Sequence, residues 1–529
     1  MTDAWRAQRE ETMDISPQGP QHVTATLASL LQDPDVGGAD PFSWLTHAPD
    51  DEIAGLLAGI SATLDGGTPI SEHRLAALFR GLVERAYLGG GRTWNRLTEA
   101  SLAGAVRLYG QLGPRSGVRH LLLQLLAASR RPDDLQQFTE LLVEDPPGDE
   151  TAAAVALGPL FQHRDFDAAV LFPRLFDALS QPALGAAVLD LSNYVTREGL
   201  LAIHPATDRR GSLATLLGAV VQRLGVIEDR PETVASDPRE LSAVVQHAVS
   251  LAVSLCDSLG LIGDPASVGK LNQVLELRHR RLRTEAAAAL ARLGDENGQQ
   301  VLSSLAAEPV ARLRVLAYAS ELGLESMIDE RFATSAARAE AELACWLAQP
   351  TQLGFPPSRL ELVDTQTYYW PGYDEPVECF LFRYAYEMSQ GEYAGIGIAG
   401  PLCHAFAADL ADLPPEDIFA VFAGWHAEHD EIYELDAQQL NTQQRVEVAR
   451  LARRLQDQAY VRIEPVKLGL FFQERVLIAL AERDGQAGVA VVDPDAILWI
   501  PTQGRRRPLG ADEAYALFKG RRILRAFNP

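Results

Sequence analysis

Three histidines in the C-terminal third of the chain are the side chains best suited to bind a metal ion. His426 and His429 are three positions apart, and Glu428, Asp430 and Glu431 stand beside them. Zinc requires three or four ligands that converge on one point. His404 could supply a third nitrogen if its segment packs against this stretch. The candidate metal ligands are therefore His404, His426 and His429.

The element expected around these histidines argues against a metal site. The spacing of apolar residues predicts a helix over residues 415–435. At about 100° per residue, both histidines fall on its apolar face, whereas Asp430, Glu431 and Glu434 point to the opposite side. We therefore favour a buried, hydrogen-bonded histidine pair, and we predict no catalytic residue and no cofactor.

A glycine pattern over residues 395–400, Gly-Ile-Gly-Ile-Ala-Gly, has the GxGxxG spacing of dinucleotide-binding loops. Such a loop must join a buried parallel strand to the N-terminus of a helix. Here the glycines fall inside a predicted strand, opposite Phe380, Phe382 and Tyr384 of the other strand of a hairpin, and Pro401 follows directly. We therefore expect these glycines to accommodate aromatic side chains.

A second pattern, in residues 263–271, superficially matches a phosphate-binding P-loop. Its spacing is one residue too long, and Leu271 stands where a hydroxyl group would bind magnesium. Ser267 and Lys270 also have the Ser-x-x-Lys spacing of serine acyl-enzymes, but the accompanying motifs are missing. A turn between repeated helices explains all of these residues.

An aromatic stretch over residues 368–373, Tyr-Tyr-Trp-Pro-Gly-Tyr, is prone to form a loop. Exposed aromatic side chains make good anchors for a partner, so Tyr369, Trp370 and Tyr373 are candidate interaction residues. The same side chains could instead attach the C-terminal sheet to the end of the helical region. We favour this second interpretation.

Charge is distributed unevenly in the C-terminal part. Residues 404–435 contain eight acidic residues and no Lys or Arg, whereas basic residues crowd the end of the chain. The two runs could attract each other within the domain or across a dimer, although a solvated surface is the slightly favoured interpretation. Arg505, Arg506 and Arg507 complete the candidate interaction residues.

The elements that must position these residues begin with a repeat. Residues 259–264 (Leu-Gly-Leu-Ile-Gly-Asp) match residues 290–295 (Leu-Ala-Arg-Leu-Gly-Asp) at an offset of 31, and Arg283 matches Arg314 at the same offset. A period of this length is typical of stacked helical hairpins. Gly263 and Gly294 suit left-handed positions at helix C-termini, and the aspartates that follow them suit N-caps.

This pattern resembles the HEAT repeat in the short form found in many bacterial proteins. The matching residues are Arg283, Ala286, Ala287, Leu290, Gly294 and Asp295. The resemblance implies an α-solenoid of the armadillo type and a protein partner, since the family is chiefly an interaction module.

The domain organisation follows from breaks in composition. We predict a disordered leader at 1–20, a helical N-terminal cap at 21–100, HEAT-like helical repeats at 101–350 and an α+β domain at 351–529. The fold class is thus mostly α, with a smaller α+β domain that carries an antiparallel sheet with helices on one face. In that domain we expect a hairpin over 380–398, a meander over 476–500, and helices at 415–435, 441–456 and 511–519.

Composition restricts the classes of partner. The chain has 529 residues and a formal net charge of −24, which argues against generic binding to nucleic acid or an anionic membrane. We find no run of eighteen apolar residues and no signal-peptide pattern, so we predict a cytoplasmic protein. The four cysteines are scattered, which supports neither a zinc knuckle nor a disulfide framework.

Three functions remain open from the sequence. The favoured one is a non-enzymatic scaffold or adaptor that binds a protein partner through the solenoid, with the C-terminal domain adding specificity. The second is an enzyme, possibly metal-dependent, with its site in the C-terminal domain. The third is a sensor of a small molecule or peptide at the domain junction.

Overall fold

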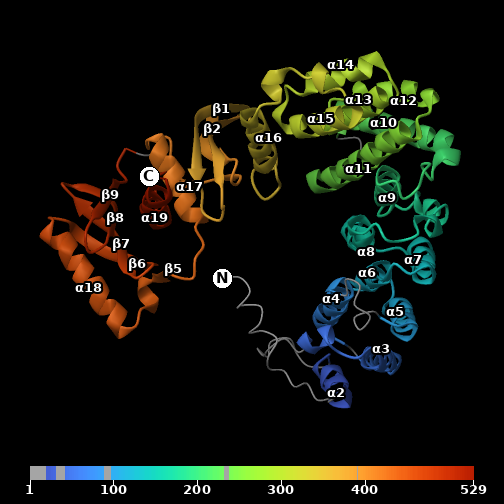
Figure 1. Cartoon of the computed structure of the whole chain (residues 1–529), viewed down its shortest axis with the longest axis horizontal. Helices are drawn as coiled ribbons and strands as arrows, with labels where there is room; N and C mark the ends of the chain where they lie inside the picture. The colour runs from blue at the N-terminus through green and yellow to red at the C-terminus, as the bar shows by residue number, and fades with distance from the viewer. Residues whose placement is uncertain are drawn as a thin grey trace. The chain divides into compact units, whose positions relative to one another are not determined.

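The chain forms two compact units, Met1–Val301 and Leu302–Pro529. The computed structural model describes residues 19–30, 42–68, 70–88, 97–231, 237–389, 391–504 and 506–528. Most of the predicted leader at 1–20 lies outside these ranges. The first unit is helical in its described part, and the second carries both helices and strands (Figure 1). These features confirm the expected fold class, mostly α followed by α+β.

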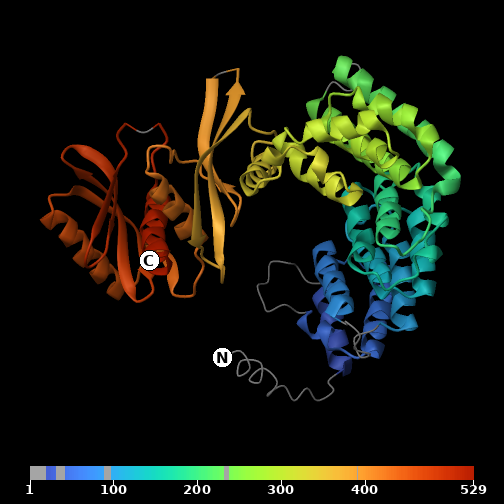
Figure 2. The ribbon, with the colours of Figure 1, turned by 45° about the horizontal axis from the view of Figure 1, so that its top comes forward.

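The first unit is built from helices that pack in pairs. Several helices pack on the next but one along the chain: α3 packs on α5, α4 on α6, α6 on α8, α9 on α11, α10 on α12 and α11 on α13 (Figure 2). This pattern is compatible with an α-solenoid. In chain order the helices are α2 (Gly19–Leu30), η1 (Ser43–Thr46), α3 (Asp50–Asp65), α4 (Glu72–Leu88), α5 (Glu99–Leu112), α6 (His120–Ser129), α7 (Pro132–Glu144), α8 (Glu150–Gln162), η3 (Ala168–Val170), η4 (Arg174–Ala178), α9 (Gly185–Arg197), η5 (Thr207–Arg209), α10 (Arg210–Asp229), α11 (Pro238–Ile262), η7 (Pro265–Ser267), α12 (Val268–Leu275), α13 (Arg280–Arg292) and α14 (Glu296–Leu305).

The repeat turns have the predicted backbone. Gly263 and Gly294 have φ angles of 78° and 80°, so both occupy the left-handed region after a helix. The Oδ1 atom of Asp264 accepts a hydrogen bond from the Ala266 N–H at 3.0 Å, and Oδ1 of Asp295 accepts from the Gly298 N–H at 2.8 Å. Each Gly-Asp pair therefore ends one helix and begins the next.

A buried arginine, Arg312, lies two positions before Arg314, the residue that matches Arg283 in the repeat. Arg283 is half-buried and Arg314 is exposed. Arg312 is only 3% exposed, and its guanidinium donates to the carbonyl oxygens of Ala306 at 2.8 Å and Ala337 at 2.7 Å. Those acceptors are at a helix end and in the next helix, so a sequence offset could not single out Arg312.

One hydrophobic core runs through the first unit from Phe42 to Leu290. The longest helix, α11, carries eleven buried residues, which are crowded into its second half. Two helices, Thr207–Asp229 and Pro238–Ile262, are long and apolar enough to cross a membrane by length and composition, a test that core helices of soluble proteins also pass.

A buried histidine joins α9 to the loop that follows it. The ring of His204 is 3% exposed, its Nδ1 accepts from the Ala206 N–H at 3.2 Å, and its Nε2 lies 2.9 Å from Oδ1 of Asn193. The proton of the neutral ring is therefore on Nε2. Burial lowers the pKa of His204 to about 4, because a charged imidazole would lose its contact with water.

We expect the His204 site to make the first unit sensitive to acid. Because the folded pKa lies below the unfolded value, the neutral ring stabilises the fold fully above about pH 6.5, and this contribution declines as the pH falls toward 4. Urea denaturation followed by circular dichroism should show a loss of about 2 kcal/mol between pH 7.5 and 5.0. The His204→Gln variant should lack this part of the pH dependence, and an equal loss in both proteins would contradict the assignment.

The second unit begins with helices and continues as two antiparallel sheets. The strand orders are β1-β2-β3-β4 and β5-β6-β7-β8-β9. We predicted a single sheet and a boundary near Pro350, whereas α15 and α16 belong to the same compact unit as the strands. The elements are α15 (Pro309–Leu322), η8 (Glu325–Met327), η9 (Glu330–Phe332), α16 (Ser335–Leu347), β1 (Arg359–Tyr369), β2 (Pro376–Met388), β3 (Gly391–Ala399), β4 (His404–Ala405), α17 (Pro415–His426), β5 (Ile432–Asp436), η10 (Ala437–Gln439), α18 (Thr442–Asp457), β6 (Val461–Phe471), β7 (Glu474–Arg483), β8 (Gln486–Val492), β9 (Ile497–Pro501) and α19 (Ala511–Phe527).

Helices cover both faces of each sheet. Helix α16 packs on the first sheet through Leu343 and Leu347. Helices α17 and α19 fill the space between the two sheets, and α18 covers the outer face of the second sheet (Figure 1). The expected arrangement, with helices on one face only, is therefore wrong. Both sheets carry apolar residues on each side, so each side requires a cover.

The predicted hairpin and meander are present, but one helix is shorter than expected. In the hairpin, Phe382 pairs with Gly397 and Tyr384 with Gly395. The helix predicted over 415–435 ends at His426, and residues 432–436 form β5, an edge strand on β6. Pairing with β6 outweighed the helical spacing of these residues, which is a tertiary effect that the local sequence does not contain.

Candidate functional site

The three candidate metal ligands do not converge. His404 stacks on Trp425 with ring centres 3.8 Å apart, and burial lowers its pKa to about 4. Nδ1 of His426 accepts the Trp370 indole N–H at 3.1 Å. In the ranges that the structure describes, no group of three or more His, Cys, Asp or Glu side chains could hold a metal ion.

His429 lies beyond the end of α17 and so is not on the apolar face predicted for it. Its Nδ1 accepts the Glu431 N–H at 3.1 Å, and its ring lies 5.2 Å from that of Phe472. The expected buried pair of His426 and His429 is therefore wrong, because the chain leaves the helix between them. Each histidine instead has a separate partner.

The aromatic stretch is divided between the core and the surface. Trp370 is 2% exposed and belongs to the core around α17 and α19, so its ring is not offered to a partner. Tyr369 and Tyr373 are 45% and 42% exposed. The Tyr373 hydroxyl donates to the Pro401 carbonyl at 2.7 Å, and Asn528 accepts the Tyr369 N–H at 2.7 Å. The loop is thus held within the second unit.

The candidate arginines also differ from one another. Arg505 lies outside the described residues, and Arg506 is exposed. Arg507 is half-buried: its guanidinium lies 4.6 Å above the centre of the Tyr393 ring and donates to the Ala394 carbonyl. Arg507 therefore attaches the loop before α19 to β3.

The opposite charge runs do attract each other inside the second unit. Arg521 forms two hydrogen bonds of 2.7 Å with Asp417, and the Lys519 ammonium lies 3.4 Å from Glu434. The favoured interpretation of two solvated surfaces is wrong for these pairs. They join α19 to α17 and to β5.

The glycine pattern serves packing, as predicted. Gly395 and Gly397 lie inside β3. A Cβ atom on Gly395 would lie 2.5 Å from the Tyr384 hydroxyl oxygen, and one on Gly397 would lie 3.0 Å from Leu343. The absent side chains leave room for Tyr384 of β2 and for Leu343 of α16, which lie together in the core on that face of the sheet.

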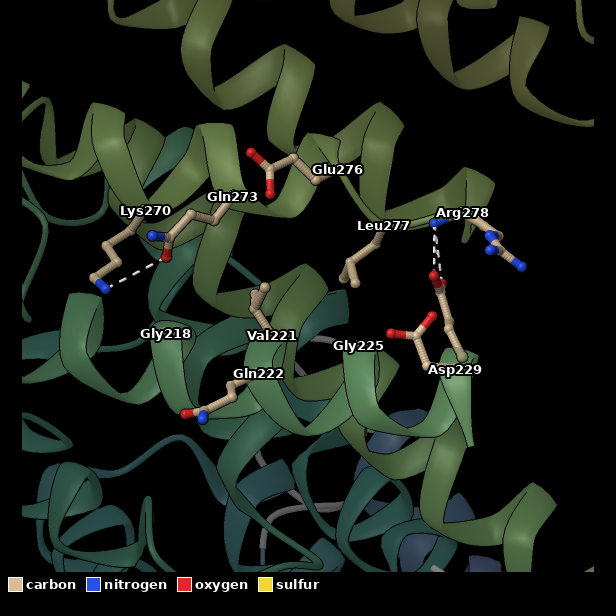
Figure 3. A pocket seen from close by; sticks show the side chains of 11 residues that line it. Gly218, Val221, Gln222, Gly225, Asp229, Lys270, Gln273, Glu276, Leu277 and Arg278 are labelled. Carbon is tan, nitrogen blue, oxygen red and sulfur yellow. Dashed lines mark hydrogen bonds between the residues drawn. The ribbon is translucent and has the colours of Figure 1, made fainter. Parts of the chain in front are cut away.

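The first unit contains a groove that we did not predict from the sequence. It lies between α10 and α12 and has a volume of about 550 Å³ (Figure 3). This volume falls in the usual range for ligand sites. The lining residues are Gly218, Val221, Gln222, Gly225, Glu228 and Asp229 from the α10 side, and Lys270, Gln273, Glu276, Leu277 and Arg278 from the α12 side.

Two glycines open this groove. Gly218 and Gly225 are two helical turns apart on α10 and so share one face. A Cβ on Gly225 would be 4.0 Å from Leu277, and Val221 and Leu277 are almost fully buried, so the floor of the groove is apolar. Larger side chains at the two glycine positions would fill the space between the helices.

The polar groups of the groove are separated along its length. The Lys270 side chain lies across Gly218 at one end, and Asp229 lies at the other end (Figure 3). The Lys270 ammonium contacts Gln273 at 3.4 Å. Within the described residues, no salt bridge involves Lys270, Asp229 or Glu276, so these charges face solvent in the groove. Both carboxylate oxygens of Glu228 accept a hydrogen bond of 3.0 Å from the Arg278 N–H, so this carboxylate already has a partner.

A second cavity of about 380 Å³ lies in the first unit beside the N-termini of α6 and α8. Its most buried cation, Arg119, is already paired with Asp145 at 2.6 Å. Asp149, which also lines the cavity, caps α8 by accepting from the Ala152 N–H. Arg119 and Asp149 already have hydrogen-bonding partners within the chain. The α10–α12 groove is therefore the better candidate site.

Comparison of the chain with protein families, curated proteins and solved structures gives no match. The sequence held one signal for the groove, since glycines at positions 218 and 225 in an otherwise apolar helix indicate close approach or open space. The two glycines do not indicate which helix lies on the other side of the groove.

Proposed function

We propose that this protein is a non-enzymatic adaptor that binds a protein partner through its helical first unit. The observation that carries the proposal is the groove between α10 and α12, with its apolar floor and its unpaired charges at the ends. Grooves between helices are common binding sites in helical proteins. The resemblance to HEAT repeats, clearest over residues 250–325, supports the same function, because stacked helix pairs present extended binding surfaces.

The second unit has a different role in this proposal. Its exposed Tyr369, Tyr373 and Arg506 could add contacts with the same partner. No described feature of that unit favours the enzyme hypothesis, because His404, His426 and His429 each have a separate packing partner. In this proposal the second unit therefore adds specificity through these surface residues and does not act as an enzyme.

We expect a photo-reactive amino acid at Gln222 to cross-link a discrete partner in cells. Gln222 is exposed and lines the groove, so its side chain would touch a bound partner. The matched control places the same amino acid at Val446, which is exposed on α18 in the second unit. Mass spectrometry of the cross-linked species would identify the partner. Identical species from both positions, or none from Gln222, would refute binding at the groove.

We expect Gly225→Phe to block the groove without disturbing the fold. The new ring would extend into the space beside Leu277, and glycine is itself a poor helix former. Partner cross-linking through Gln222 should fall at least about tenfold, equivalent to about 1.4 kcal/mol of binding free energy. Gly211→Phe, on the same helix but outside the groove, should leave cross-linking unchanged.

A further inference from the structure

Four aromatic rings of the second unit form a cluster that reaches the surface. The His404 ring stacks on Trp425 with ring centres 3.8 Å apart and an interplanar angle of 13°. The rings of Trp346 and Phe406 lie 5.7 Å and 4.8 Å from that of His404. Trp425 is 46% exposed, whereas the other three side chains are half-buried. We refer to these four residues as the aromatic surface.

The indole of Trp425 is held in place and keeps one face open. His404 covers one face, and Phe406 contacts Trp425 edge to face with ring centres 5.9 Å apart. Because nearly half of Trp425 remains exposed, its second face is accessible to a partner. A tryptophan that is already ordered loses little conformational entropy on binding. Trp425 therefore has the properties of an anchor residue at a protein interface.

The charges beside the aromatic surface favour a cationic occupant. Glu342 is one turn before Trp346 on α16, so the two side chains share one face of that helix. Glu428 is three residues beyond Trp425. Both carboxylates are exposed, and neither forms a salt bridge with another described residue. The basic residue of α16, Arg338, donates instead to a backbone carbonyl before the start of the helix.

The end of α17 adds to this negative potential. Trp425 lies in the last turn of α17, where the free carbonyl groups of a helix carry a partial negative charge. Residues 404–435 contain eight acidic residues and no Lys or Arg. Burial lowers the pKa of His404 to about 4, so the ring stacked beneath Trp425 is uncharged at neutral pH and does not repel a cation.

A guanidinium group matches this combination of an aromatic face and carboxylates. It is planar and weakly hydrated, so it stacks on an indole ring while its N–H groups donate to a carboxylate in the same plane. An ammonium group is strongly hydrated and cannot stack. Nucleic acid is a poor occupant, because the carboxylates would repel its phosphates. The chemistry therefore favours a protein segment that presents an arginine.

We propose that the aromatic surface binds an arginine of a partner protein. The guanidinium stacks on the open face of Trp425 and pairs with Glu428, and the charge of Glu342 adds attraction at longer range. This binding site lies entirely in the second unit. It goes beyond the proposed function of the α10–α12 groove and does not depend on what that groove binds.

The test uses full-length protein labelled with 5-fluorotryptophan and two five-residue peptides. One peptide has arginine at positions two and four with glycine elsewhere, and the other has citrulline, which keeps the shape of arginine without its charge. In ¹⁹F NMR the Trp425 signal, assigned by its loss in Trp425→Phe, should shift on titration with the arginine peptide. The affinity should be at least about tenfold higher than for the citrulline peptide. High salt should reduce this difference, because it screens the paired charges.

Substitutions make the test specific to this surface. Glu428→Gln should weaken binding of the arginine peptide about tenfold, because it removes the paired charge. Glu378→Gln is the matched control, since Glu378 is exposed on β2 and its loss changes the net charge equally. Trp425→Leu should also weaken binding about tenfold, because leucine offers an apolar surface without an aromatic face. Thermal unfolding of each variant shows whether its fold is intact.

Several results would overturn the arginine site. These are an unshifted Trp425 signal in the labelled protein, equal affinity for the citrulline peptide, equal affinity for a peptide with lysine in place of arginine, or equal effects of Glu428→Gln and Glu378→Gln. The signal of the labelled protein decides the question even if Trp425→Leu does not fold. Cross-linking at Gln222 tests the groove separately, so the two sites can fail independently.

Discussion

Gly520→Ala is expected to destabilise the second unit by at least about 3 kcal/mol, because the added methyl group meets backbone. Helices α17 and α19 cross with Gly424 facing Ala516 and Gly520 facing Ala420. A Cβ on Gly520 would overlap the Ala420 carbonyl oxygen, which belongs to a helix and cannot rotate away as a side chain could. The helices would have to separate, and the core between the two sheets would open.

Chemical denaturation measured by tryptophan fluorescence would test this expectation, since Trp346, Trp370, Trp425 and Trp499 all lie in the second unit. Gly110→Ala of the first unit, followed by circular dichroism, is the control, because Gly110 is inside α5 and a Cβ there meets nothing within 4 Å. The control should gain about 0.5–1 kcal/mol from helix propensity. Equal effects of the two substitutions would show that the α17–α19 crossing is not close-packed.

Arg522→Ala is the second substitution with a large expected effect, about 3–5 kcal/mol, because it leaves a buried carboxylate without its cation. Asp493 is 0% exposed, and Arg522 of α19 forms an ion pair with its Oδ2. The Oδ1 atom accepts the N–H groups of Asp495 and Ala496 at 2.6 and 2.5 Å. This one carboxylate therefore holds both the turn between β8 and β9 and the end of α19.

Arg525→Ala provides the matched control, since Arg525 is exposed on the same helix. Arg525→Ala should lower the free energy of unfolding by less than about 0.5 kcal/mol. Adding Asp493→Asn to Arg522→Ala should recover part of the stability, because the amide keeps the oxygen acceptor and removes the charge. If Arg522→Ala costs no more than Arg525→Ala in urea denaturation, the ion pair does not stabilise the unit.

The local sequence was sufficient to predict the structure wherever one residue type determines the backbone conformation. Gly263 and Gly294 end helices because only glycine occupies the left-handed region without strain, and both do so in the structure. The alternation of aromatic residues over 380–386 likewise predicted a strand whose partner strand carries glycines. Each of these features depends on residues that are close in sequence.

The sequence was insufficient to predict the structure where a segment far along the chain determines how residues pair or pack. The stretch after His426 has helical spacing, yet residues 432–436 pair with β6. The two halves of the strand-bearing region form separate sheets because α17 and α19 pack between them through Gly424 and Gly520. Neither glycine indicates by itself which helix it approaches.

The candidate site also combines features that the sequence predicts with features that only the tertiary structure decides. Composition and repeat spacing determined that the first unit would be helical, because amphipathic periodicity and turn chemistry are local properties. Only the tertiary structure decided that the faces of α10 and α12 leave a groove between them, with Lys270 at one end and Asp229 at the other. A groove is the space between two surfaces, and the position of the second surface depends on packing across residues far apart in the chain.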